Sequence, residues 1–559
     1  MDKIVLELYT YKDSSELEFV KALRQVFSRN KMTPVSKAKL IVSYKNLIKK
    51  GELKANKNFA RLLVKRAVRT MSGVSVITVL SKPFVCPGKC VYCPTEPDMP
   101  KSYLSNEPAA ARAKMNLFDP IRQVTMRIQA LENNGHQVDK LEVLVLGGTW
   151  SVYPEKYQRE FIRDLFYAAN TFSDDKKREA LSLEEEQIIN EDTKYKIIGL
   201  TLETRPDYIN PTELKKLRAL GTTRVQLGVQ HTDNKILDLI VRGHSIEQSI
   251  EATKLLKEVG LKVDHHYMPD LPGSTPAKDL EMMKYVYTSP DLQPDQIKIY
   301  PCVVNEYAEL HKWYEDGKYK PFSAEELLNL LIEIKKITPP WIRINRLIRD
   351  IPEESIIAGN KITNLRQYLQ AELKKQGKSC PCLRCREVRG RSKDNDKMIL
   401  VKREYRASDG DEIFISFESE DNKKLYGFLR LRFNDDTSKN IFKELENASL
   451  VRELHVYGKM IPTYNEDQDD EISQTQHMGL GDKMVAIARR CAKEVIVPLD
   501  TGCCGFAGDR GLLVPGLTES ATKMESNEII DIDADGYYST SRTCEMGMTL
   551  ATDKSYDSI

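Results

Sequence analysis

The sequence predicts an α/β protein whose largest part is a complete or partial βα barrel spanning about residues 74–350. Short runs rich in Val, Ile and Leu recur along this stretch, and amphipathic helical segments separate them. Strands that alternate with helices pair in parallel, and chemistry in such barrels lies on the loops at the carboxyl ends of the strands. The runs are VSVITVL, LEVLVLGG, IIGLTLETR, VQLGVQH, KVDHHYMPDLPG, QIKIYP and WIRINRL.

A basic helical region over residues 1–73 precedes the barrel domain, which we bound at residues 74–370. Leu17, Val20 and Leu23 recur at helical spacing among lysines and arginines. Residues 1–70 hold 17 Lys and Arg against 6 Asp and Glu, although the whole chain carries a net charge of only +2. This asymmetry is typical of a polyanion binder, and the alternative is a solvated helical face.

Composition places the chain among large globular proteins. Its 559 residues are 41% hydrophobic and 30% charged, and no run approaches the roughly 18 apolar residues of a membrane helix. The N-terminus lacks the pattern of a secretory signal, so we expect a cytoplasmic protein without membrane association. In that compartment its 11 cysteines are better interpreted as metal ligands or reactive thiols than as disulfides.

A first cysteine cluster, CPGKCVYC, follows the first barrel strand and places Cys86, Cys90 and Cys93 at the spacing C-x3-C-x2-C. Three thiolates on one loop suit three irons of a [4Fe–4S] cluster and leave the fourth iron open. An open iron binds the amino and carboxylate groups of S-adenosylmethionine and delivers the electron that cleaves it. The alternative is a zinc loop, but structural zinc takes four ligands and no fourth Cys or His lies nearby.

This loop and the PTEPDMPKSYLSNEPAAARA that follows it resemble the radical S-adenosylmethionine family. The blocks LEVLVLGGTW, GLTLETRPDY, RVQLGVQ, RGH, HHYMPDLPG, KIYP, RINRLIRDIP and VRELHVYG together resemble the catalytic subunit of Elongator, a tRNA-modifying acyltransferase. The resemblance implies synthesis of 5-carboxymethyluridine at the tRNA wobble position: a 5′-deoxyadenosyl radical takes hydrogen from the methyl group of acetyl-CoA, and the carbon radical adds to C5 of uridine. It also implies an electron donor, and we expect a homodimer.

The same resemblance assigns roles to residues at strand ends and in the basic region. Gly147 and Gly148 would admit the methionyl amine, and Lys140 would contact acetyl-CoA, the alternative being a solvent-facing lysine before a strand. Four further side chains are expected to meet substrates, or else to form capping hydrogen bonds of the barrel: Glu203, Arg205, Gln230 and His266. The expected tRNA-phosphate contacts are Lys65, Arg66 and Arg69.

A second cluster, Cys380, Cys382 and Cys385, lies in a linker that we bound at residues 371–394. Family members carry a zinc-binding linker here, and thiolates at this spacing suit Zn²⁺, which would contribute folding energy. A fourth ligand is not evident from the sequence. Buried unmetallated thiols and a redox role are the alternatives.

Residues 395–482 resemble a truncated N-acetyltransferase domain of the GNAT type, an α+β fold. The glycines of QHMGLG would turn backbone N–H groups toward the pyrophosphate of acetyl-CoA. The tyrosine-bearing segment that normally closes this site is missing. The residues expected to bind acetyl-CoA are Glu453, Leu454, His455, Val456, Gln476, Gly479, Leu480, Gly481 and Asp482.

Residues 483–559 resemble the end of cysteine-rich iron–sulfur oxidoreductases of the D-lactate dehydrogenase type, with Cys503, Cys504 and Cys544 in TGCCGFAGDRG and SRTCEMG. No flavin domain or upstream cysteine half-domain accompanies this tail, so we interpret it as a graft. Two alternative functions are a protein lysine acetyltransferase, which would need a complete acetyl-CoA site where this one is broken, and a catalytically impaired tRNA-binding scaffold.

Overall fold

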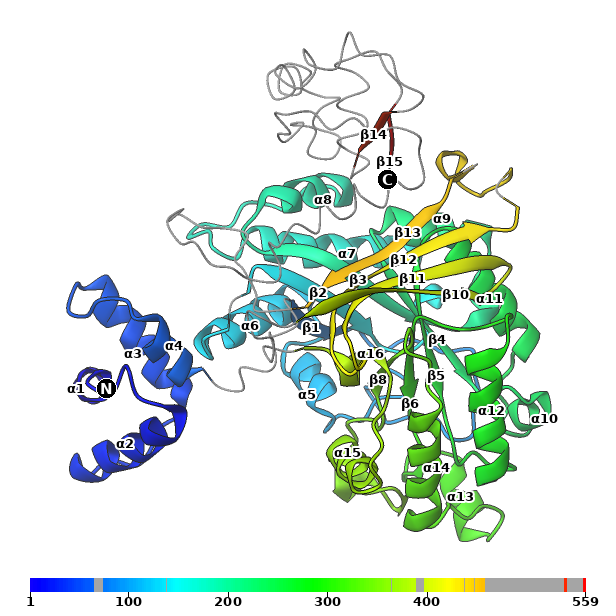
Figure 1. Cartoon of the computed structure of the whole chain (residues 1–559), viewed down its shortest axis with the longest axis horizontal. Coiled ribbons are helices and arrows are strands. Elements are labelled where there is room, and N and C mark those ends of the chain that lie inside the picture. Colours follow the sequence, from blue (N-terminus) through cyan, green and yellow to red (C-terminus); the bar gives the residue numbers. More distant parts are fainter. Residues whose placement is uncertain are drawn as a thin grey trace.

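The computed structural model describes residues 1–64, 74–136, 138–362, 364–388, 397–436, 438–446 and 448–457, together with the backbone of 537–539 and 556–558. Its centre is an open sheet of parallel strands in the order β1-β2-β3-β4-β5-β6-β8 (Figure 1). Both end strands pair with one neighbour only, so the barrel is partial. The strands are β1 (Ser75–Leu80), β2 (Lys140–Leu146), β3 (Lys196–Thr204), β4 (Arg224–Gln230), β5 (Lys262–Tyr267), β6 (Gln296–Ile299) and β8 (Arg343–Arg346).

Helices connect successive strands and cover the outer face of this sheet (Figure 1). Serine capping boxes fix the starts of several of them, including Ser245 and Ser323. A short pair of strands, β7 (Val303–Val304) and β9 (Ala358–Gly359), lies outside the main sheet. The helices are α5 (Pro108–Met115), α6 (Pro120–Asn133), α7 (Glu155–Asn170), α8 (Leu183–Asp192), α9 (Pro211–Ala219), α10 (Asn234–Leu239), α11 (Ile246–Glu258), α12 (Pro276–Thr288), α13 (Leu310–Glu315), α14 (Ala324–Lys336), α15 (Leu365–Lys375) and α16 (Leu383–Arg386).

The N-terminal helices form a unit with its own apolar core, beside α6 (Figure 1). Helix α1 lies within the region predicted to be helical, and its Ile4, Val5 and Leu8 are buried in this core. Gly135, after α6, packs against Ile41 and so joins the unit to the barrel. The helices are α1 (Asp2–Tyr9), α2 (Glu16–Arg29), α3 (Lys37–Lys49) and α4 (Lys57–Leu63).

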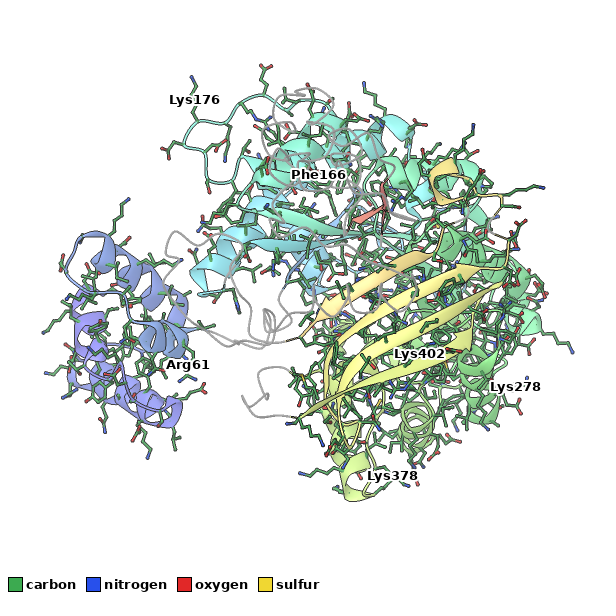
Figure 2. All side chains as sticks on the ribbon, turned by 45° about the horizontal axis from the view of Figure 1, so that its top comes forward. Arg61, Phe166, Lys176, Lys278, Lys378 and Lys402 are labelled. Atoms are coloured by element: carbon green, nitrogen blue, oxygen red, sulfur yellow. The ribbon has the colours of Figure 1, made fainter. Side chains whose placement is uncertain are left out.

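A second, antiparallel sheet has the order β10-β11-β12-β13 and lies across the barrel (Figure 2). Its outward face carries Lys402, which Figure 2 labels, and the partly exposed apolar residues Leu400, Val451 and Leu454. Its strands are β10 (Met398–Arg406), β11 (Gly410–Ser419), β12 (Leu425–Asn434) and β13 (Leu450–Val456). These strands are compatible with the α+β domain predicted there, and the identity of this sheet as part of an acetyltransferase domain stays a prediction.

The inward face of this sheet binds the barrel through a buried ionic network. Arg452 donates to both oxygens of Asp295, at 2.9 and 2.5 Å, and lies 2.8 Å from Glu412. Lys257 of α11 lies 3.4 Å from Glu412. The guanidinium and ammonium groups hold the pKa of the Asp295 carboxyl well below its usual range despite its burial. Removing one partner from such a network leaves a buried charge without a counter-charge, which is destabilising. These groups therefore hold the second sheet against the barrel.

At the C-terminal end the structure describes only a short parallel pair, β14 (Tyr537–Ser539) and β15 (Tyr556–Ser558). The cysteines of the tail, Cys503, Cys504 and Cys544, lie outside the described residues. Across the part of the chain that is described, no helix is both long and apolar enough to cross a membrane.

Candidate active site at the carboxyl ends of the barrel strands

The loop that carries Cys86, Cys90 and Cys93 leaves the carboxyl end of β1. Backbone bonds from Val91 to the Ile240 carbonyl and from Leu310 to the Val91 carbonyl hold this loop on the barrel. The three sulfur atoms do not gather within 4.8 Å of one another, as those of Cys380, Cys382 and Cys385 do. Thiolates at about 2.3 Å from a single ion would lie closer together, so the spread suits ligands of separate metal atoms.

Two arginines surround this loop. Arg242 donates to the Cys90 sulfur at 3.5 Å and to the Gly228 carbonyl at 3.1 Å. Arg205 is bound to Asp207 and to the Gly243 carbonyl, which leaves its buried Nη1 without a hydrogen-bond partner among the described residues. A Cβ on Gly88 would lie 2.7 Å from that Nη1, so the glycine brings the loop against the guanidinium.

The Cys93 thiol lies in a buried setting that favours its neutral form unless a metal binds. Burial raises the pKa of Cys93 to about 12, and the neighbouring Cys90 adds to the shift. Tyr92 lies beside Cys90, and burial followed by that thiol raises its pKa as well. Metal binding must therefore displace protons here, and cations such as Arg242 compensate the thiolate charge.

Gly147 and Gly148 follow β2 directly beside the loop. Gly147 has a φ of 138°, and a Cβ there would lie 2.0 Å from the Ser81 hydroxyl oxygen, so glycine is required. Gly148 has a φ of 98°. The Cys86 sulfur lies 3.7 Å from the hydroxyl of Thr149. The glycine turn and the cysteine loop are thus neighbours, as expected.

Glu203 and His266 meet inside the barrel mouth. One Glu203 oxygen accepts from the Tyr103 hydroxyl at 2.7 Å, and the other lies 3.8 Å from His266 Nδ1. His265 bonds to Thr253 of α11 on the outer side, so the alternation of the strand points His266 inward. Its Nε2 is buried and has no hydrogen-bond partner among the described residues. Burial, aided by Lys298, holds the pKa of His266 well below its usual range, so the ring is neutral.

Gln230 ends β4 with a φ of 75°, a backbone conformation that non-glycine residues rarely adopt. Its amide nitrogen would lie 2.9 Å from a Cβ on Gly228, where Arg242 also packs. Strain of this kind is concentrated at functional sites. The structure therefore brings Glu203, Arg205, Gln230 and His266 to one mouth with the cysteine loop.

Lys140 does not join this group. It is the first residue of β2, at the opposite end of the strand from Gly147, and seven residues of strand span about 20 Å. That opposite edge is where the second sheet packs, since Glu453 of β13 lies 3.9 Å from Lys262, the first residue of β5. Between the two edges the interior is polar: Lys298 donates to Gln226 at 2.6 Å.

The residues expected to bind acetyl-CoA are described only in β13. Glu453 accepts from Arg430 at 3.0 Å, and Lys262 followed by Arg430 lowers its pKa to about 2 against the effect of burial. Leu454 lies on the exposed face, and His455 packs on Tyr457 at 4.3 Å between ring centroids. Outside the described residues are Gln476, Gly479, Leu480, Gly481 and Asp482, and also Lys65, Arg66 and Arg69.

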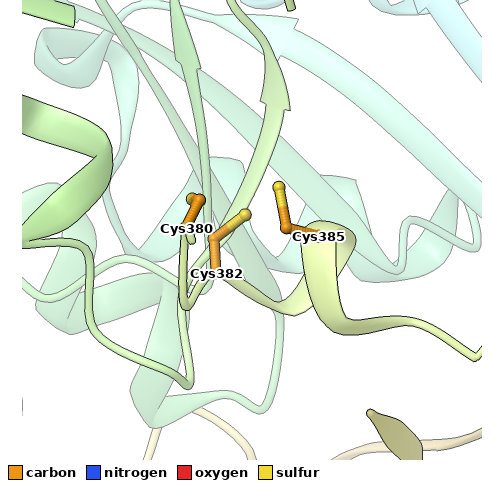
Figure 3. A group of neighbouring side chains, drawn as sticks. All are labelled: Cys380, Cys382 and Cys385. Atoms are coloured by element: carbon orange, nitrogen blue, oxygen red, sulfur yellow. The ribbon is translucent and has the colours of Figure 1, made fainter. Parts of the chain in front are cut away.

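The linker thiols Cys380, Cys382 and Cys385 converge within 4.8 Å beside α16 (Figure 3). Buried Lys335 of α14 donates to the Cys385 sulfur at 3.7 Å. Hydrogen bonds from the Cys380 and Cys382 thiols, together with Lys335, hold the pKa of Cys385 far below its usual value. The described residues supply no fourth His, Cys, Asp or Glu to this group.

Residues that the sequence did not single out complete the mouth. Arg349, after β8, donates to Ser102 and Glu107 at 2.9 Å each, and its guanidinium lies 4.8 Å from the Tyr103 ring centroid. Arg349 thereby connects the segment that follows β1 to the opposite end of the sheet, where β8 lies. The RGH, PKSYLSNEP and RINRLIRDIP blocks contain Arg242, Tyr103 and Arg349, but nothing in the sequence indicated their contacts.

These observations fit a [4Fe–4S] cluster on the loop: three spread thiols, an arginine on one sulfur and a second arginine with a free buried N–H against the loop glycine. Fold and site together define a radical S-adenosylmethionine enzyme. The family described as Radical SAM superfamily matches residues 81–286, and the Radical_SAM C-terminal domain matches residues 294–375.

The chain belongs to the family of tRNA uridine(34) acetyltransferases and Elongator complex protein 3. It is 43% identical to the tRNA uridine(34) acetyltransferase of Methanocaldococcus infernus, over 78% of this chain and 81% of the relative. It is 35% identical to Elongator complex protein 3 of Saccharomyces cerevisiae, over 77% of this chain and 78% of the relative. The solved Methanocaldococcus infernus Elp3 with an N-terminal deletion matches with a TM-score of 0.63 and 39% identity, over 75% of this chain and 90% of that chain.

Proposed function

We propose that this chain modifies the wobble uridine of tRNA, attaching a carboxymethyl group that derives from acetyl-CoA to C5. The observation that carries the proposal is the cysteine loop beside Gly147, Glu203 and His266 at one barrel mouth, in a relative of tRNA uridine(34) acetyltransferases. Bound there, the cluster and S-adenosylmethionine supply the reductive bond cleavage that lets hydrogen be removed from an unactivated methyl group.

The residues of the barrel mouth bind and orient the cofactor and the substrates. Gly147 and Gly148 leave room for backbone contact with the methionine part of the cofactor. The Tyr103 hydroxyl fixes Glu203 through one carboxylate oxygen, and the other oxygen can accept a hydrogen bond from a substrate hydroxyl. Neutral His266, whose buried Nε2 has no hydrogen-bond partner among the described residues, is suited to form a hydrogen bond to a bound substrate.

Acetyl-CoA would approach from the second sheet. Lys140 starts β2 at the edge where β13 packs, which suits its expected contact with the cofactor. The outward face of that sheet carries Leu400, Val451 and Leu454, as expected of a sheet that further elements of an α+β domain cover. The role of Glu453, His455 and the glycine segment remains part of this proposal.

The N-terminal helices would position tRNA through phosphate contacts, which makes binding sensitive to salt. The triad Cys380, Cys382 and Cys385 would hold a structural zinc with a ligand from elsewhere. A cytoplasmic location, an electron donor for the cluster and a homodimer complete the proposal.

Anaerobic reconstitution tests this function. The protein is supplied with iron, sulfide and S-adenosylmethionine, and 5′-deoxyadenosine and modified nucleosides are measured with and without tRNA and acetyl-CoA. We expect the modified nucleoside only in the complete mixture, whereas some deoxyadenosine also forms without tRNA through cleavage that is not coupled to base modification. Cleavage without any base modification would favour an impaired scaffold, and acetylated protein without deoxyadenosine would favour a lysine acetyltransferase.

A further inference from the structure

Three aromatic rings are stacked beside the cysteine loop and have no part in the chemistry above. Phe84 stacks on Tyr153 with ring centroids 4.8 Å apart and planes 27° apart, and Tyr153 stacks on Tyr157 at 5.1 Å and 26°. The ammonium of Lys82 lies 4.6 Å from the Tyr157 ring centroid. We call Phe84, Tyr153 and Tyr157 the ring ladder.

Hydrogen bonds make the ladder rigid. The Tyr153 hydroxyl donates to the Lys82 carbonyl at 2.7 Å, and the Lys82 amide donates to the Tyr157 hydroxyl at 3.0 Å. The backbone just before Phe84 is therefore clamped by the two rings below it. The Phe84 side chain therefore loses little conformational freedom when a partner binds to the outer face of its ring.

The ladder is exposed only at its outer end. Tyr153 is 4% exposed, whereas Phe84 is 39% and the adjacent Val85 78% exposed. Lys82 and Lys89, which flank Phe84 and Val85 in the sequence, are exposed as well. An exposed apolar surface with cations around it is typical of a binding site, and a flat ring favours a flat partner.

We propose that the outer face of Phe84 is a stacking platform for a base of the tRNA anticodon loop next to the uridine that is modified. This inference rests on the proposed function, because a uridine that leaves its stack deprives the neighbouring base of a partner. Phe84 precedes Cys86 by two residues, or about 7 Å of extended chain, and Cys86 in turn touches Thr149 of the glycine turn. Lys82 and Lys89 are placed to contact the adjoining phosphates.

Base stacking on an aromatic side chain contributes about 1–3 kcal/mol, which corresponds to roughly a 5- to 150-fold change in affinity. The test compares Phe84→Leu, which keeps an apolar side chain but removes the ring, with Phe84→Trp, which enlarges it. Val85→Ala is the matched control, because this neighbour is more exposed but carries no ring. Binding of an anticodon stem-loop RNA to the full reconstituted chain is measured at several salt concentrations.

We expect Phe84→Leu to weaken RNA binding about 5- to 150-fold without changing its salt dependence, because stacking releases no counterions. Phe84→Trp should bind at least as tightly as the parent, and Val85→Ala equally well. Deoxyadenosine formation without RNA, with dithionite as reductant, should be the same in all four proteins.

Unchanged RNA affinity of Phe84→Leu would overturn the proposal. A loss that is confined to turnover with a protein reductant would also overturn it, because the surface of Phe84 would then bind the electron donor. A loss of RNA-free deoxyadenosine formation would overturn it as well, because the Phe84 ring would then be structural. Binding is measured without turnover. A parent that makes no modified uridine but shows the Phe84 effect would therefore refute the proposed function and leave the platform standing.

Discussion

The two cysteine triads of this chain use the same ligand type in opposite arrangements. Cys86, Cys90 and Cys93 lie on a loop at the barrel mouth with their sulfurs spread apart, next to glycines and an arginine. The triad of Cys380, Cys382 and Cys385 gathers its sulfurs within 4.8 Å in a linker packed between α14, α15 and the second sheet.

The different arrangement of the sulfur atoms indicates that the two triads have different roles. Spread thiols at strand ends suit a cluster whose open corner faces the substrates. Converging thiols away from that mouth suit one ion that holds a linker in shape. Spacing alone separates them poorly, since both are runs of three cysteines, whereas the convergence of the sulfurs within 4.8 Å is found in the second triad and not in the first.

Replacing a thiol of the first triad should have the largest effect. We expect Cys90→Ala to abolish deoxyadenosine and modified-uridine formation, because a cluster with two protein ligands is not held, while the melting temperature changes little. The matched control is Cys302→Ala, which removes a buried thiol outside both triads. Activity in Cys90→Ala equal to that of the control would refute the role of this triad.

Replacing a thiol of the second triad should reverse the pattern. Cys382 is fully buried, and we expect Cys382→Ala to lose bound zinc and to melt well below the parent, because structural zinc contributes folding free energy directly. Deoxyadenosine formed per folded molecule below the melting transition should stay within a few-fold of the parent. Its complete loss with an intact melting curve would contradict this assignment.

The cation beside each triad offers a smaller test. Arg242→Met removes the donor to Cys90, and we expect about a tenfold slower deoxyadenosine formation. Lys335→Met removes the ammonium beside Cys385 and should weaken zinc binding about 10- to 100-fold, measured by chelator competition, without slowing the chemistry. If both substitutions slowed deoxyadenosine formation equally, the two triads could not be assigned different roles.

Acidity should weaken the barrel mouth through His244, which bonds to the Gly228 carbonyl near Arg242. Burial, followed by Arg242, lowers its pKa to about 4. The unfolded chain takes up this proton below about pH 6.5 and the folded chain does not, so stability is complete above pH 6.5 and falls toward pH 4, by at most about 3 kcal/mol. Melting temperatures across this range should fall less steeply for His244→Gln than for the parent.

Local patterns predicted the barrel well. Each apolar run became a strand, because buried parallel strands are nearly continuous in Val, Ile and Leu, and the glycine turn lay where the motif placed it. The helical region predicted over residues 1–73 begins with α1, and burial of Ile4, Val5 and Leu8 against other helices stabilises these eight residues as a helix.

The contacts of the site were less accessible to prediction. Arg242 meets Cys90 across 152 positions of sequence, and Tyr103 meets Glu203 across 100. No periodicity encodes such pairs. The position of Lys140 at the far edge likewise depends on strand direction and on where the second sheet packs.

Metal analysis of two triple variants tests the central claim most directly. The parent, reconstituted anaerobically, should hold about four irons and one zinc. Alanine at Cys86, Cys90 and Cys93 should remove the iron and leave the zinc, and alanine at Cys380, Cys382 and Cys385 should remove the zinc and leave the iron. Iron that remains in the first variant, or that disappears only in the second, would contradict the assignment of the cluster to the barrel mouth.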